Sequence, residues 1–119
     1  MKSNKEFKAD YKQMKFPMGV FQIRNKVNGK ILIDSSTNMN AKWNRHRLQL
    51  GVGNNWLTDL QNDWKKYGEE NFVFEVLSTL EEKVGGDANY RNKLALLEEM
   101  ILEEKQPYGE KGYNTEKKH

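Results

Sequence analysis

The sequence predicts an α+β fold in which a small antiparallel three-stranded sheet is flanked by helices. Two apolar runs surround a tight-turn sequence at residues 19–34, and a third apolar run lies at residues 72–77. Apolar side chains at helical spacing occupy the segments between and after these runs. No internal repeat or linker divides the 119 residues, so we expect one domain with a single core.

Composition restricts the class of protein. The chain is 36% hydrophobic and 31% charged, as in soluble globular proteins, and it contains no Cys. Disulfides, thiolate metal sites and a cysteine nucleophile are therefore excluded. There is no apolar leader segment and no apolar run approaching the length of a membrane span, so we expect a cytoplasmic protein without a membrane partner.

Residues 1–17 are expected to form an N-terminal helical extension. Ser3-Asn-Lys-Glu6 has the form of a capping box, and apolar side chains then recur at helical spacing. Pro17 disfavours helical geometry at the residue before it and so ends the segment. A frayed arm that packs loosely on the domain is the alternative.

An antiparallel hairpin is expected next. Residues 19–25 and 30–34 are rich in β-branched and other apolar side chains, and Asn28-Gly29 between them suits the positive φ angles of a tight turn. The run at 72–77 is the expected third strand.

Three helices are expected after the hairpin. The first follows the turn and cap residues 35–38 and ends at Gly51 and Gly53, and the second ends at Gly68. The third covers residues 90–105. On the first of these helices the spacing places Lys42, His46 and Gln49 on a shared side.

Charge is distributed unevenly along the chain. Residues 1–50 hold 11 Lys and Arg against 3 Asp and Glu, and residues 51–119 hold 9 against 14, so balances of +8 and −5 make up the net charge of +3. A basic half is what phosphate binding requires, because each neutralised phosphate releases counterions. An unevenly charged solvated surface is the alternative.

Several site chemistries have no sequence support. The glycines form no phosphate loop, and the two histidines, His46 and His119, cannot make a His-rich metal site. A nucleophilic serine motif is also absent. Any metal is expected to be a hard cation on oxygen ligands, and Glu98 is either one such ligand or part of a solvated helix face.

Together these segments resemble the GIY-YIG nuclease family, especially its small stand-alone and homing-endonuclease-like members. Residues 19–21, Gly-Val-Phe, stand where the family has Gly-Ile-Tyr, and residues 32–34, Leu-Ile-Asp, stand where it has Tyr-Ile-Gly. The similarity continues in order to Gly-Tyr-Asn at 112–114 and covers about four-fifths of the chain. It divides the chain into the extension 1–17, a GIY-YIG-like domain 18–115 and a charged tail 116–119.

The resemblance implies hydrolysis of nucleic-acid phosphodiesters with one Mg²⁺-type ion. In the family, a first tyrosine acts as or relays to the general base, and a second organises the attacking water. A helix arginine binds the phosphate, a glutamate holds the metal and a late asparagine orients these groups. The matching positions here are, in that order, Phe21, Leu32, Lys42, Glu98 and Asn114.

Three of these positions carry altered chemistry. Phe21 lacks a hydroxyl, Leu32 lacks any polar side-chain atom, and Lys42 cannot form a bidentate fork on phosphate. Loss of general-base help alone costs about 10²–10⁴-fold in rate. Glu98 is left as the predicted Mg²⁺ ligand, or as a carboxylate retained for capping or hydrogen bonding.

Further positions near the expected site also differ. Asp34 replaces the glycine of the second motif and adds a carboxylate near the phosphate position, and Asn55 aligns with a histidine often found in the family. His46 is either a partly exposed helix residue or a replacement for the missing base. Four aromatic side chains are expected in the core rather than as base-stacking platforms: Trp43, Trp64, Phe72 and Phe74.

Three functions are compatible with this pattern. The first is DNA binding with absent or strongly reduced Mg²⁺-dependent cleavage, through phosphate contacts by Lys26, Lys30, Lys42, Arg45 and Arg47. The second is an active endonuclease with His46 as base, Lys42 as phosphate clamp and Glu98 as metal ligand. The third is a protein-interaction module that uses an apolar surface formed by Phe21 and Leu32.

Overall fold

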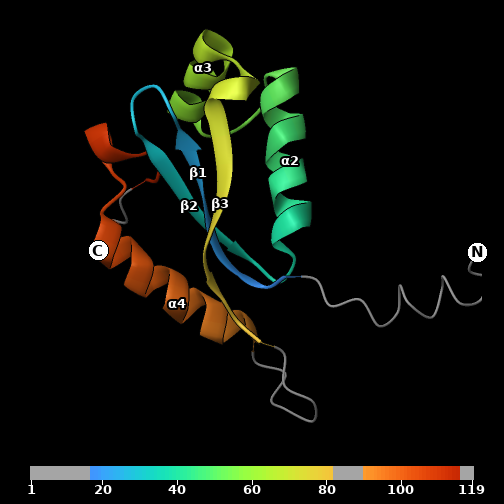
Figure 1. The fold of residues 1–119 in the computed structure, drawn as a ribbon, viewed down its shortest axis with the longest axis vertical. Coiled ribbons are helices and arrows are strands. Elements are labelled where there is room, and N and C mark those ends of the chain that lie inside the picture. Colours follow the sequence, from blue (N-terminus) through green and yellow to red (C-terminus); the bar gives the residue numbers. More distant parts are fainter. Residues whose placement is uncertain (1–16, 82–89, 116–119) are drawn as a thin grey trace, which may run out of the picture.

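The computed structural model describes residues 17–81 and 90–115, and its architecture confirms the predicted α+β class (Figure 1). The three strands form one antiparallel sheet in the order β2-β1-β3, so the hairpin lies beside the third strand. The predicted N-terminal helix and charged tail lie outside the described residues. The elements are β1 (Gly19–Asn25), β2 (Ile31–Ser36), α2 (Met39–Val52), α3 (Thr58–Tyr67), η1 (Glu69–Asn71), β3 (Phe72–Thr79), α4 (Tyr90–Lys105) and η2 (Gly109–Lys111).

Helices cover both faces of the sheet. α2 and α4 each pack against β1 and β2, and they lie on opposite sides of the strands in Figure 1. The main hydrophobic cluster joins the sheet to α2 and α3, and the four predicted core aromatics belong to it or pack against it. Within the described residues, no helix combines the length and apolar character needed to cross a membrane. The cytoplasmic location stays a prediction.

The prediction that Phe21 and Leu32 form an exposed apolar surface is wrong. Phe21 is completely buried and Leu32 is 4% exposed, and both belong to the main cluster. Strand geometry explains this burial. Phe21 and Ile23 lie two residues apart on β1 and so point to the same face, and Leu32 is paired with Ile23 across the hairpin. Helices α2 and α3 cover that face. The Phe21 ring packs against the Phe74 ring with centroids 5.2 Å apart.

The hairpin turn uses only one of the two expected positive φ angles. Gly29 has a φ of 78°, whereas Asn28 is not among the described residues with positive φ. Asn28 acts through its side chain instead, because its Oδ1 accepts a hydrogen bond of 2.9 Å from the Lys30 N–H. Its Nδ2 donates to Asp63 on α3 at 3.2 Å, which ties the turn to that helix.

Gly19 is required by the close approach of β1 and β3. A Cβ at this position would collide with the backbone of Ser78, next to the point between Val20 and Phe21 where the register of β1 and β3 shifts. This packing requirement gives a physical reason for a glycine at the start of the first motif, independent of any chemistry.

The C-terminal segment covers the free edge of β2. Gln106 takes a left-handed φ of 49° after α4 and redirects the chain. Gly112 then forms a parallel bridge with Ile31, and the Tyr113 N–H donates to the Ile31 carbonyl at 2.8 Å. The Tyr113 hydroxyl donates to Asp63 at 2.6 Å, so the end of the domain is fixed to α3 as well.

Candidate functional site

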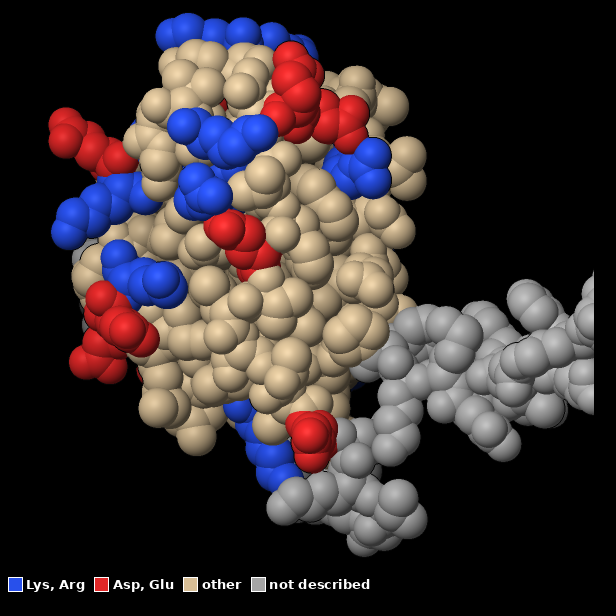
Figure 2. Space-filling model, viewed as in Figure 1, with Lys and Arg blue, Asp and Glu red and all other residues tan. Residues whose placement is uncertain are grey.

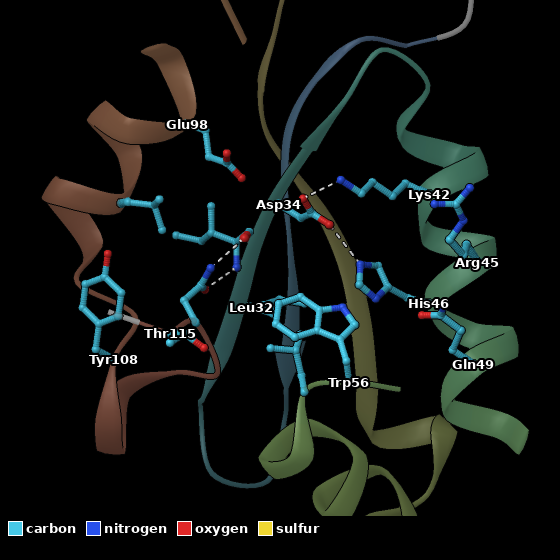
Figure 3. A pocket seen from close by; sticks show the side chains of 14 residues that line it. Leu32, Asp34, Lys42, Arg45, His46, Gln49, Trp56, Glu98, Tyr108 and Thr115 are labelled. Atoms are coloured by element: carbon cyan, nitrogen blue, oxygen red, sulfur yellow. Dashed lines mark hydrogen bonds and ion pairs between the residues drawn. The ribbon is translucent and has the colours of Figure 1, made fainter. Parts of the chain in front are cut away.

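A cavity of about 520 Å³ lies at the β2 edge, between α2 and α4 (Figure 3). We call it the α2–α4 cavity. Successive side chains of β2 point to opposite faces of the sheet, and because the cavity lies at the sheet edge, Leu32, Ile33 and Asp34 all line it. Figure 3 shows Glu98, Asp34 and Lys42 at one end and Trp56 and Tyr108 at the other. The cavity therefore has a charged end and an aromatic end.

A second cavity of about 510 Å³ adjoins the first and shares Lys42, Arg45 and Glu98 with it. We call it the basic groove. Residues 35–37, two serines and a threonine, line it together with Arg91 of α4. Three cationic side chains and one carboxylate thus surround a surface that also carries hydroxyl groups.

Helix geometry explains how α2 supplies one wall. The helix begins after Asn38, whose side chain accepts from the Ala41 N–H at 3.1 Å, and it ends at Gly53 in a left-handed conformation with φ of 84°. The spacing of three and four residues then places one set of polar side chains on the cavity side: Lys42, Arg45, His46 and Gln49.

Asp34 joins the two α2 side chains at the charged end. Its Oδ1 accepts from Lys42 Nζ at 2.8 Å, and its Oδ2 lies 3.0 Å from His46 Nε2. Burial raises the pKa of the Asp34 carboxyl, but hydrogen bonds from His46 and Lys42 together outweigh burial, and the pKa lies below its ordinary value. The carboxylate is ionised at neutral pH and offsets the charge of Lys42.

His46 is buried, with 5% exposed, and not partly exposed as the sequence suggested. Asn55 Oδ1 accepts from the Leu57 N–H at 2.9 Å, which turns the Asn55 Nδ2 toward His46 Nδ1 at 3.4 Å. From these partners we infer that Nδ1 accepts a hydrogen bond and Nε2–H donates to Asp34. Each ring nitrogen of His46 thus has a side-chain partner within the protein.

The predicted metal ligand Glu98 lies across the cavity from Asp34 and Lys42 (Figure 3). Among the described residues there is no group of three or more His, Cys, Asp or Glu side chains that could hold a metal ion. The Asp34 oxygens are already bonded to Lys42, His46 and the Ser35 N–H. A Mg²⁺ ion held by Glu98 would therefore need water and substrate oxygens as its remaining ligands.

The Asn114 side chain forms hydrogen bonds with the backbone of β2. Its Oδ1 accepts from the Ile33 N–H at 2.8 Å, and its Nδ2 donates to the Ile33 carbonyl at 2.9 Å. The amide thus mimics a strand residue along the free edge. The orienting role expected for Asn114 stays a prediction, whereas its structural role follows from these two bonds.

The predicted phosphate contacts separate into two groups. Lys42 and Arg45 line both cavities, and Arg45 is exposed and forms no ion pair within residues 17–81 and 90–115. Arg47 instead pairs with Glu69 at 2.8 Å. Lys26 and Lys30 belong to the hairpin turn and its flank, outside both cavities. Figure 2 likewise shows Lys and Arg interspersed with Asp and Glu on the viewed face, not gathered into one basic surface.

Sequence reasoning missed Trp56, Tyr108 and Arg91. Trp56 lies between α2 and α3, out of helical spacing with either, which is a sequence feature that indicates a non-core aromatic. Arg91 comes from α4, and no local pattern indicates that it lies beside α2. Only the packing of both helices against the sheet brings it to the basic groove.

No family model and no curated protein matches the sequence. Two solved structures match in three dimensions, and both are of the catalytic domain of the homing endonuclease I-TevI. One has a TM-score of 0.69 at 23% identity and covers 84% of this chain and 99% of that chain. The other, a mutant of the same intron endonuclease domain, has a TM-score of 0.67 at 22% identity and covers 83% and 93%. The chain therefore has the GIY-YIG fold that the sequence predicted.

Proposed function

We propose that this chain binds DNA through the basic groove and cleaves phosphodiesters slowly or not at all. The observation that carries the proposal is the basic groove itself, where Lys42, Arg45 and Arg91 meet beside a cavity whose proton-accepting groups are engaged. The shared fold with an endonuclease catalytic domain supports nucleic acid as the partner.

The two arginines supply the main attraction for phosphate. Arg45 and Arg91 are exposed and make no ion pair within the described ranges. A guanidinium group matches the oxygens of phosphate with two parallel hydrogen bonds, and Ser and Thr hydroxyls add phosphate contacts. Lys42 contributes less, because two of its three N–H groups already donate to Asp34 and to the Ser35 carbonyl.

Efficient hydrolysis needs a group that takes a proton from the attacking water. Phe21 has no hydroxyl and is buried, and the His46 nitrogens are both bonded. Asp34 is a weak base, since the pKa of its carboxyl, which burial alone would raise, is lowered overall by the hydrogen bonds from His46 and Lys42. A rate at least about 10²-fold below that of an intact site is expected.

The test measures binding and cleavage on the same DNA. Anisotropy of a labelled duplex at low salt is expected to report binding, and a supercoiled plasmid with Mg²⁺ or Mn²⁺ is expected to stay intact. The Glu98→Ala variant serves as the control. Nicking by the wild type that disappears in Glu98→Ala would instead establish an active endonuclease, and absence of binding at low salt would overturn the proposal.

A further inference from the structure

Trp56 is an exposed aromatic side chain at the α2–α4 cavity to which phosphate binding gives no role. It is 73% exposed, whereas Trp64 is 7% exposed and Trp43 packs against the core. Large apolar side chains left in water forgo the stabilisation that burial provides, so an exposed indole lining a cavity indicates a partner for its face.

The aromatic end of the cavity has a composition suited to a flat, neutral group. Its apolar lining comes from three leucines, Leu32, Leu57 and Leu102. Tyr108 lies on the side of the cavity nearer α4, and Trp56 lies across from it (Figure 3). The volume of about 520 Å³ is within the range of about 300–1,000 Å³ found for small-molecule pockets. Gln49 and Thr115 add polar side chains to this lining, which a ligand with polar edges requires.

The two cavities also differ in the charge of their lining side chains. The α2–α4 cavity is lined by two cationic and two acidic side chains, so its charges balance. The basic groove is lined by three cationic side chains and one acidic one. A ligand with a neutral part and an adjoining anionic part would match the pair. A nucleotide within a DNA strand has these properties, with a neutral base and a charged phosphate.

We propose that the α2–α4 cavity receives one unpaired DNA base, stacked on Trp56, while the adjoining phosphates lie along the basic groove. The inference rests on the proposed DNA binding and adds the form of DNA that is recognised. A base inside a duplex is stacked on its neighbours and cannot offer a face to Trp56, so single strands and unpaired bases are preferred.

The experiment compares three labelled DNAs of equal length: a single strand, a fully paired duplex and a duplex with one bulged base. We expect the first and third to bind about ten-fold more tightly than the paired duplex. Trp56→Ala should remove most of that difference and leave the affinity for paired duplex unchanged, and Trp56→Phe should retain a large part of it. Leu48→Ala is the matched control, because Leu48 is 71% exposed on α2 and lines neither cavity.

Tryptophan fluorescence gives a second reading. Since Trp43 and Trp64 lie in or against the core, a change on adding single-stranded DNA that is absent in Trp56→Phe reports stacking at Trp56. Equal affinity for all three DNAs, with Trp56→Ala unchanged and binding still sensitive to salt, would overturn this inference and leave the proposed function standing. Absence of binding to every DNA would overturn the proposed function itself.

Discussion

Lys42 and Asp34 form an ion pair of 2.8 Å at the charged end of the α2–α4 cavity. The resemblance of the sequence to the GIY-YIG pattern aligns Lys42 with the phosphate-binding arginine and Asp34 with the second-motif glycine. The carboxylate offsets the cation that would otherwise face phosphate. Lys42 and Asp34 therefore balance each other's charge at this end of the cavity.

Asp34→Asn should increase DNA affinity by about two- to ten-fold at low salt. The substitution keeps an acceptor for Lys42 but removes a negative charge beside the phosphate path, and the gain should diminish as salt screens the charge. Anisotropy titrations at several salt concentrations measure it. Glu75→Gln is the control, because Glu75 pairs with Arg24 at 2.7 Å and lines neither cavity. Equal effects of both substitutions would contradict a specific role for Asp34.

The free energy of unfolding should fall at acid pH, and this fall should be smaller in Asp34→Asn than in the wild type. Burial raises the pKa of the Asp34 carboxyl but the bonds from His46 and Lys42 lower it further, so the pKa is depressed in the folded state. The unfolded chain therefore binds the proton first. The stabilisation is complete above the ordinary value of about pH 4 and is lost as pH falls below it toward the folded pKa.

Urea unfolding between about pH 7 and pH 3 measures this dependence. Some slope should persist in Asp34→Asn, because the hydrogen bond from Arg24 also lowers the pKa of the Glu75 carboxyl. The further variant Asp34→Asn with Glu75→Gln should be flatter still. An acid slope that Asp34→Asn leaves unchanged would show that the ion pair with Lys42 contributes no pH-dependent stability.

Asn114→Ala should lower the free energy of unfolding by about 1–3 kcal/mol. The variant loses both bonds to the Ile33 backbone, at 2.8 and 2.9 Å, and leaves part of the β2 edge without its partner. Thermal or urea unfolding beside Thr115→Ala, an exposed neighbour, measures the difference. Equal stability of the two variants would refute a structural role for the Asn114 amide.

Gly19→Ala should destabilise the domain by about 1–3 kcal/mol, because the added methyl collides with the Ser78 backbone. Gly51→Ala on α2 is the matched control. Its Cβ would meet no atom within 4 Å, so alanine there should be neutral or stabilise by up to about 1 kcal/mol. Parallel urea unfolding of both variants decides the matter, and a stable Gly19→Ala would disprove the close-approach argument.

Local features of the chain made most of the fold predictable. α2 ends at Gly53 and α3 ends at Gly68, as predicted, and α4 covers the predicted range Tyr90–Lys105. These features were predictable because helix capping and apolar spacing are local properties of the sequence. The burial of Phe21 was missed, since the sequence does not reveal that helices cover that face of β1. The family pattern suggested a surface there, and packing overrode it.

The candidate site was less predictable because it depends on contacts between distant segments. The exposure of His46 was predicted from its position on the helix alone. Its partners Asp34, on β2, and Asn55, beyond the helix, come from other segments of the chain. Arg91 enters the basic groove only because α4 packs against β2 from the side opposite to α2, so that both helices line the groove. Charge counts along the chain likewise could not separate Arg45, which makes no ion pair with the described residues, from Arg47, which is paired.

The salt dependence of DNA affinity is the decisive measurement for phosphate binding in the basic groove. The wild type, Arg45→Ala, Arg91→Ala and the control Arg47→Ala would be titrated with the same duplex over a series of salt concentrations. We predict that Arg45→Ala and Arg91→Ala each weaken binding and reduce the slope of log affinity against log salt by about 0.9, the value for one lost phosphate contact, while Arg47→Ala keeps the wild-type slope. Absence of wild-type binding at low salt, or slopes that are the same for all four proteins, would show that the basic groove does not bind DNA phosphates.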